Sequence, residues 1–176
     1  DQGYCLGEHG FFDKRMMLEQ SSRMPFVIRY PRDLPQGTRN ESLFMNIDIP
    51  ALLLDYAQVK RPEQMQGESF RSLLKDDKLE GRPYTYYRYW EHSPDRPAHF
   101  GIRSSRYKLI YYYGKPLGMK SANVQATPPS WEFYDLETDP NELKNVFNEP
   151  SYQDLIVKMH ASLINEKAFY EDHQTP

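Results

Sequence analysis

The sequence lacks several features that would assign it to a specialised class of protein. Its 176 residues include one cysteine, Cys5, so an intrachain disulfide framework is excluded and cysteine usage does not indicate the compartment. No apolar run approaches the roughly 20 residues that a membrane-spanning helix needs. The 22 Lys and Arg residues are scattered among 25 Asp and Glu residues, and the net charge of -3 argues against nucleic acid as the main partner.

Aromatic residues, by contrast, are abundant: fourteen Tyr, nine Phe and two Trp. The second half contains four aromatic-rich runs that favour β-strands, and we predict strands over residues 84–90, 99–103, 107–113 and 131–136. Residues 104–106 are expected to form a hairpin turn. A final helix is predicted over about residues 150–170, with one apolar face made by Tyr152, Leu155, Ile156, Met159 and Leu163. The simplest assembly is an antiparallel sheet with one amphipathic helix packed on it.

The first half is predicted to contain fewer regular elements. Residues 1–23 are interpreted as a glycine-punctuated loop, and the apolar run over residues 24–30 as a buried strand entered by a proline. A helix is predicted over residues 48–57, because Asp48 can cap free amide groups and Pro50 falls in the first turn, where its missing donor costs nothing. A short turn is expected over residues 69–74.

Two oxygen donors stand side by side at the start of the loop. Asp1 and Gln2 precede Gly3, and glycine permits the sharp backbone turn that would bring both side chains to one ion. Hard cations such as Ca²⁺ and Mg²⁺ take such ligands in shells of about six, so further ligands would have to come from elsewhere. The alternative, favoured by spacing alone, is an ordinary turn.

Three other side chains in this loop have more than one interpretation. Lys14 lies between Asp13 and Arg15, so it belongs either to a solvated charge cluster or to a site that neutralises phosphate or sulfate oxygens. His9 could act as an acid, a base or a substrate donor, or could satisfy loop carbonyls. Cys5 has no visible activating partner and is interpreted as a small buried thiol.

Taken together, these motifs resemble the late active-site segment of the type I sulfatases in the alkaline phosphatase superfamily. The resemblance runs in order through nearly the whole chain, over residues 1–3, 6–10, 13–15, 23–31, 46–55, 101–110 and 132–142. It implies an α/β fold in which residues 1–82 end the catalytic domain and residues 83–176 form a small antiparallel-sheet subdomain with a terminal helix. It also implies that Asp1 and Gln2 bind a metal, Ca²⁺ in preference to Mg²⁺, and that Lys14 contacts the sulfate.

The resemblance also shows what this sequence does not contain. Sulfatases carry a Cys- or Ser-x-Pro-x-Arg motif whose first residue becomes the formylglycine nucleophile, and the residue after Cys5 is Leu6. We therefore expect the chain to be the C-terminal portion of a larger enzyme, inactive alone, whose missing N-terminal part supplies the nucleophile. The sulfatases that it most resembles are periplasmic or secreted bacterial enzymes acting on sulfated carbohydrates.

Substrate contacts are predicted at His9, Arg15, His92 and His99, which lie in or near segments that border the sulfatase cleft. For His92 and His99 the alternative is that they cap strands. Two other functions stay open at this point. One is a phosphatase or a phosphodiester or phosphonate hydrolase of the same superfamily, and the other is a non-catalytic β-rich binding module.

Overall fold

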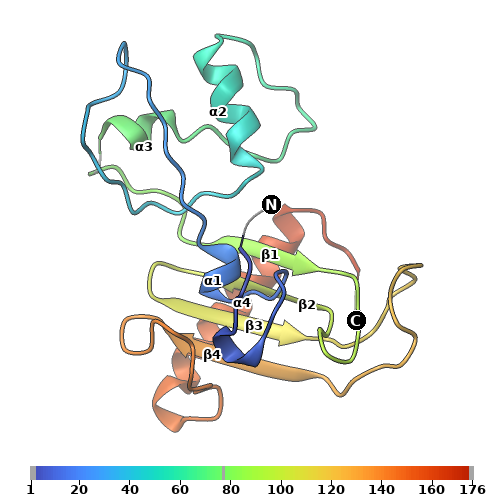
Figure 1. Cartoon of the computed structure of the whole chain (residues 1–176). Coiled ribbons are helices and arrows are strands. Elements are labelled where there is room, and N and C mark those ends of the chain that lie inside the picture. The colour runs from blue at the N-terminus through green and yellow to red at the C-terminus, as the bar shows by residue number, and fades with distance from the viewer. Residues whose placement is uncertain (1–2, 77, 175–176) are drawn as a thin grey trace. The chain divides into compact units, whose positions relative to one another are not determined.

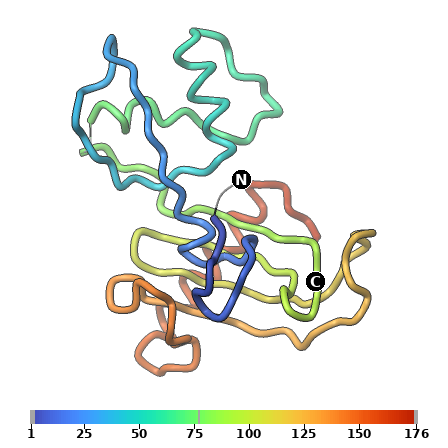
Figure 2. The backbone as a smooth tube through the Cα atoms, in the orientation of Figure 1, coloured from blue at the N-terminus to red at the C-terminus, as the bar shows by residue number. Residues whose placement is uncertain are grey.

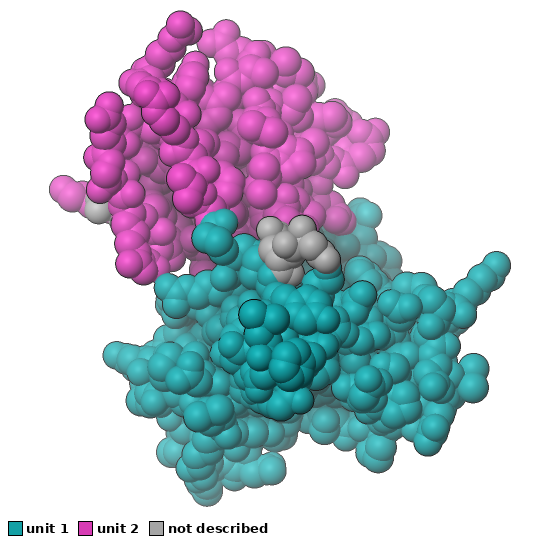
Figure 3. Space-filling view, in the orientation of Figure 1, with its two compact units in different colours: residues 1–25, 86–176 teal, residues 26–85 magenta. Residues whose placement is uncertain are grey.

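The structure is a computed structural model that describes residues 3–76 and 78–174 (Figure 1). It separates into two compact units, one made of residues 26–85 and the other of residues 1–25 together with 86–176 (Figure 3). Among the described residues, no helix has both the length and the apolar character that crossing a membrane requires.

The larger unit is built on a four-stranded sheet with the strand order β1-β2-β3-β4. The strands are β1 (Thr85–Tyr89), β2 (His99–Arg103), β3 (Tyr107–Tyr112) and β4 (Ser130–Asp135). β2 and β3 pair antiparallel, as do β3 and β4. The predicted hairpin turn is confirmed, because the Ser104 amide donates to the Tyr107 carbonyl over 2.8 Å. The four predicted strands and their antiparallel arrangement are therefore correct to within about two residues at each end.

Helix α4 (Gln153–Phe169) follows a 3₁₀ turn (Pro150–Tyr152) and packs against one face of the sheet (Figure 1). Its buried side chains are Ile156, Met159 and Leu163, three of the five predicted for the apolar face. Alternate residues of a strand point to the same face, so one face of the sheet carries many of the aromatic rings. The three buried side chains of α4 pack on this face. Phe100, Leu109 and Phe133 are all buried there.

The N-terminal segment covers the opposite face of the sheet (Figures 1 and 2). Met17 is buried against Ile110, Tyr112 and Tyr134. The close approach depends on Gly101, because a Cβ there would lie 2.7 Å from the Met17 sulfur and 2.4 Å from the Leu109 carbonyl oxygen. A residue with a side chain at this position would force the segment away from the sheet.

A buried ionic network fastens this segment in place. The Lys108 ammonium donates to the Met17 carbonyl over 2.9 Å and to Glu142 Oε1 over 2.5 Å, and it pairs with Glu19 over 2.9 Å. Arg103 adds two contacts to Glu19, at 3.1 and 3.0 Å. Burial alone would raise the pKa of Glu19, but the hydrogen bonds and charges of Arg103 and Lys108 lower it to about 2. Helix α1 (Glu19–Ser22) is thereby tied to β2 and β3.

The smaller unit contains α2 (Asp48–Tyr56) and α3 (Arg71–Lys75), close to the helix and the turn predicted from the sequence. Its interior is organised by three aromatic rings. Phe26 meets Phe44 and Phe70 edge to face at 5.1 and 5.7 Å, and Phe44 stacks on Phe70 at 4.5 Å.

Two predictions for this part of the chain differ from the structure. Residues 24–30 form no strand here, because no strand of the described chain pairs with them, and Val27 is 92% exposed. Asp48 does not cap α2. It is buried and accepts instead from the Met45 and Glu68 amides at 2.7 and 2.9 Å, so its carboxylate joins separate loops. The assignment of residues 1–82 and 83–176 to two parts of a sulfatase stays a prediction.

The close approach at Gly101 is tested by Gly101→Ala. The new methyl group meets the backbone of β3 and the Met17 sulfur, so we expect the free energy of unfolding to fall by about 1–3 kcal/mol in urea denaturation. Gly81→Ala is the matched control, because its nearest new neighbour is a terminal carbon of Leu73 at 3.3 Å. Equal effects of the two substitutions would contradict the argument.

The ionic network predicts a stability that depends on pH. Because the folded-state pKa of Glu19 is about 2 and its ordinary value is 4.5, its contribution is complete above pH 4.5 and is lost as the pH falls towards 2. Glu19→Gln should therefore flatten the decline in stability over this range, measured by urea denaturation at pH 7, 4.5 and 3. An unchanged decline would show that Glu19 is not the group responsible.

Candidate functional site

The N-terminal loop that the sequence singled out folds back on itself over the sheet. Its two arms are joined by hydrogen bonds from the Cys5 amide to the Asp13 carbonyl at 2.8 Å and from the Gly7 amide to the Phe11 carbonyl at 3.1 Å. Gly3 permits the entry, because its φ is 72° and a Cβ would lie 2.5 Å from the Ser21 carbonyl oxygen. The loop is therefore a compact structure held by its own backbone.

His9 lies at the tip of this loop, in the 3₁₀ turn Glu8–Gly10. It is exposed and has a φ of 56°, in the left-handed region. The turn is stabilised by the Glu8 carboxylate, which accepts from the Leu6 amide over 2.6 Å. This places the imidazole at the surface, where a ligand can reach it.

Lys14 and Arg15 lie on the returning arm of the loop and are both half-buried. The carboxylate of Asp13 organises them: it accepts from the Lys14 amide over 2.7 Å and from Arg15 Nη1 over 2.7 and 2.9 Å. It also pairs with Arg96, from the connection between β1 and β2. Burial opposes ionisation of Asp13, but these hydrogen bonds and charges outweigh it and lower its pKa. The structure thus brings His9, Lys14 and Arg15 onto one loop.

Sequence reasoning did not identify Asp13 or Arg96 as parts of the site. The sequence alone places Asp13 only in a charge cluster, and Arg96 lies 83 residues further along the chain. A third group that was missed is Glu132, which accepts from the Tyr112 hydroxyl over 2.9 Å on the sheet face beneath the loop. Burial raises its pKa, and His9 is among the charges that act on it. No local pattern links these residues, since only the sheet brings them together.

His92 and His99 are both buried. His92 Nδ1 accepts from the Ala98 amide at 3.2 Å, so the Nε2 that faces the Gln125 carbonyl at 2.8 Å carries the proton. His99 Nδ1 lies 2.7 Å from the Pro97 carbonyl, and its Nε2 has no hydrogen-bond partner in the described part of the chain. These contacts with the backbone match the structural alternative, and a substrate role for either histidine stays a prediction.

The predicted metal ligands, Asp1 and Gln2, lie outside the described residues. Within residues 3–76 and 78–174, no group of three or more His, Cys, Asp and Glu side chains is arranged to hold a metal ion. The interpretation of Cys5 as a buried thiol is confirmed, since it is fully buried and its sulfur lies 3.6 Å from the Ser21 hydroxyl.

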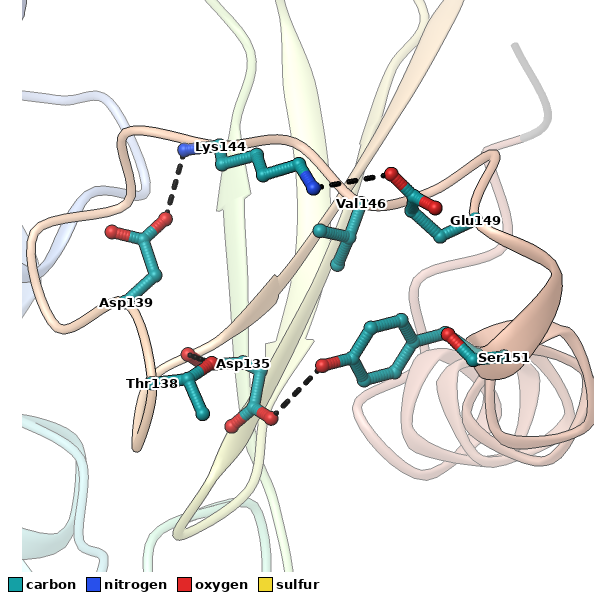
Figure 4. Close-up of a pocket in the computed structure, with 8 residues that line it drawn as sticks. Asp135, Thr138, Asp139, Lys144, Val146, Glu149 and Ser151 are labelled. Carbon is teal, nitrogen blue, oxygen red and sulfur yellow. Dashed lines mark hydrogen bonds and ion pairs between the residues drawn. The ribbon is translucent and has the colours of Figure 1, made fainter.

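A separate hollow lies between the loop after β4 and the start of α4 (Figure 4). The side chains around it are largely paired with one another. Lys144 Nζ lies 3.2 Å from Glu149, and the Tyr152 hydroxyl donates to Asp135 over 3.2 Å. We therefore assign these residues to the attachment of α4 and not to a ligand site.

Residues 7–168 match the family described as N-sulphoglucosamine sulphohydrolase, C-terminal. The chain belongs to this family. The match includes the loop with His9 and Lys14, the sheet and most of α4. It confirms the sulfatase resemblance predicted from the sequence.

Two proteins named as sulfatases are also similar to this chain. It is 36% identical over 157 residues to an N-acetylglucosamine-6-O-sulfatase of Bacteroides thetaiotaomicron, covering 86% of this chain and 26% of the relative. It is 30% identical over 179 residues to an arylsulfatase of Clostridium perfringens, and this match covers 99% of this chain and 34% of the relative.

Among solved structures, one determined in complex with its substrate D-glucosamine-2-N,6-O-disulfate matches with a TM-score of 0.86 and 32% identity. The match covers 97% of this chain and 33% of that one. The predicted fold, a small antiparallel sheet with a C-terminal helix as in sulfatases, is thereby confirmed. The chain spans about a quarter to a third of the length of these relatives.

The burial of His99 predicts a second dependence of stability on pH. Burial lowers the pKa of His99 to about 4, whereas its ordinary value is 6.5. Because only the unfolded chain binds this proton between those values, stability should fall as the pH drops from 6.5 to 4. His99→Gln keeps a donor for the Pro97 carbonyl and should reduce this fall, as measured by urea denaturation at pH 7.5, 6 and 4.5. If the variant declines as steeply as the wild type, His99 is not the titrating group.

Proposed function

We propose that this chain is the C-terminal part of a sulfatase that hydrolyses a sulfate ester on a sulfated carbohydrate. The observation that carries the proposal is the family match over residues 7–168, which includes the loop bearing Lys14. In the reaction, the S–O bond of the ester breaks and water is consumed, giving a free hydroxyl group and inorganic sulfate. Residues 1–82 would belong to the catalytic domain and residues 83–176 to the smaller subdomain.

Lys14 is proposed to contact the sulfate group. A sulfate ester carries a negative charge on its outer oxygens, and a lysine ammonium is a compact point charge suited to such oxygens. Because charge shifts among these oxygens during displacement, a cation fixed beside them lowers the barrier. The Asp13 carboxylate accepts from the Lys14 amide and from the Arg15 guanidinium, and these hydrogen bonds restrain the loop around this side chain.

Arg15 and His9 are proposed to face the sugar that carries the sulfate. Arg15 presents a planar guanidinium beside Lys14, and His9 is exposed at the tip of the same loop. A monosaccharide presents hydroxyl groups and ring oxygens that such donors can bind. A sulfated glucosamine is the substrate class we propose, supported by the N-acetylglucosamine-6-O-sulfatase and the glucosamine-disulfate complex among the similar proteins.

A divalent cation, Ca²⁺ or in second place Mg²⁺, is proposed to bind Asp1 and Gln2. The donor set fits, because a carboxylate and a carboxamide oxygen are ligands that hard cations prefer. Such a cation would polarise the sulfate oxygens as a Lewis acid. The nucleophile is proposed to be a formylglycine in a part of the enzyme outside this sequence, and the location of the enzyme to be periplasmic or secreted.

The proposal is tested on the full-length protein that contains this chain, by measuring sulfate release from N-acetylglucosamine 6-sulfate and from an aryl sulfate, and by comparing these rates with the hydrolysis of an aryl phosphate and an aryl phosphonate. We expect Lys14→Ala to lower kcat/KM on the order of 10²–10³-fold, because it removes one charge-stabilising group. Lys144→Ala is the control, since that lysine is 70% exposed and pairs with Glu149.

Each outcome of this experiment has a separate meaning. Failure of the wild-type enzyme to release sulfate from any of these esters would contradict the sulfatase assignment. Faster turnover of a phosphate or phosphonate ester would move the protein to that branch of the superfamily. Wild-type activity in Lys14→Ala would contradict the role proposed for Lys14 but not the sulfatase assignment.

A further inference from the structure

Arg96 lies in the connection between β1 and β2, far in sequence from the loop that bears Lys14. Its backbone is fixed by an isolated bridge, in which the Ser93 and Arg96 amides each donate to the other residue's carbonyl over 3.1 Å. Its side chain is only 18% exposed. The guanidinium is therefore presented from a short, closed turn at the edge of the sheet.

The guanidinium of Arg96 makes contacts in two directions. Its Nε donates to the Tyr89 hydroxyl over 2.9 Å, and its carbon lies 5.6 Å from the centre of the Tyr89 ring. Its Nη1 donates to Asp13 Oδ2. The planar fork of arginine suits this arrangement, since donors on different nitrogens engage β1 and the N-terminal loop at once.

Arg96 pairs with the carboxylate of Asp13, and this same carboxylate binds the backbone amide of Lys14. Asp13 Oδ1 accepts from the Lys14 amide over 2.7 Å. On the other side of the lysine, Arg15 has a φ of 90°, a value that costs a non-glycine residue energy and persists only where its surroundings impose it. Arg15 donates to the same carboxylate, and its carbonyl accepts from the Tyr87 hydroxyl of β1. Both neighbours of Lys14 are thus tied to the sheet.

We propose that Arg96 is a positioning residue for the Lys14 loop: it holds Asp13 against β1 and so sets the backbone from which Lys14 reaches the sulfate. This inference rests on the proposed function for its catalytic consequence. Arg96 itself need not touch the substrate. A displacement of about 1 Å at a reacting group can cost about 10²-fold in rate, so a residue acting only through Asp13 can control turnover.

The test compares Arg96→Met with Arg96→Lys and with a control, Arg106→Met. Arg106 makes an equally close pair, with its Nε and Nη2 at 2.8 and 2.7 Å from Asp135, away from the N-terminal loop. In the full-length enzyme we expect Arg96→Met to lower kcat about 10–100-fold with a smaller change in KM. Arg96→Lys should recover only part of this loss, because its donors all lie on one nitrogen and cannot reproduce the planar fork whose Nε and Nη1 engage Tyr89 and Asp13 separately. Arg106→Met should retain kcat.

A double-mutant cycle with Asp13→Asn asks whether Arg96 acts through Asp13. We expect the double variant to be no slower than the slower single variant, because both substitutions break one linkage. Independent, multiplicative losses would overturn the proposal.

Hydrogen exchange followed by mass spectrometry provides a readout that does not need activity. In Arg96→Met, amides in residues 12–16 should exchange at least several-fold faster, while those of α4 stay as in the wild type. Unchanged exchange in residues 12–16, or an equal change in Arg106→Met, would overturn the proposal even if the enzyme is a sulfatase. If residues 12–16 exchange faster in Arg96→Met but the wild-type protein has no sulfatase activity, the positioning role is supported and only the proposed function is rejected.

Discussion

The buried ammonium of Lys108 is the contact on which the organisation of the larger unit depends. It joins β3 to the Met17 carbonyl and to Glu142, while Glu19 completes the network from α1. A buried charge of this kind is tolerated only when it is fully paired, so removing any partner leaves the others uncompensated. The N-terminal segment is therefore held on the sheet by several coupled contacts, and the position of the loop before Met17 depends on them.

The two faces of the sheet differ in chemical character, because α4 covers one face and the N-terminal segment covers the other. The face beneath α4 carries apolar and aromatic side chains, such as Ile102 and Phe133, and acts as an ordinary core. The face beneath the N-terminal segment carries Lys108, Glu132 and His99, which are titratable groups with mostly defined partners. A polar sheet face is costly unless it is satisfied, and here it serves as the support for the loop with Lys14.

The sequence predicted what depends on local patterns. Aromatic runs and the period of α4 located the sheet and its helix, and the order of motifs identified the family. The predictions that differ from the structure concern residues whose conformation or partners depend on tertiary contacts. Residues 24–30 have the composition of a strand, but a strand needs a partner in a ladder. Asp48 has the position of a helix cap, but its carboxylate bonds to distant loops. The pair of Asp13 and Arg96 joins residues 83 positions apart, a distance at which no spacing rule operates.

The contact between Lys108 and Met17 has a consequence for the order of folding. It spans 91 residues, and the ion pair of Arg103 with Glu19 spans 84. Closing such long loops costs entropy before any contact compensates it, whereas the hairpin of β2 and β3 forms from neighbouring residues. We therefore expect the sheet to form before the N-terminal segment docks on it. On this order of events, Lys14 acquires its final surroundings late, after the sheet that supports its loop has formed.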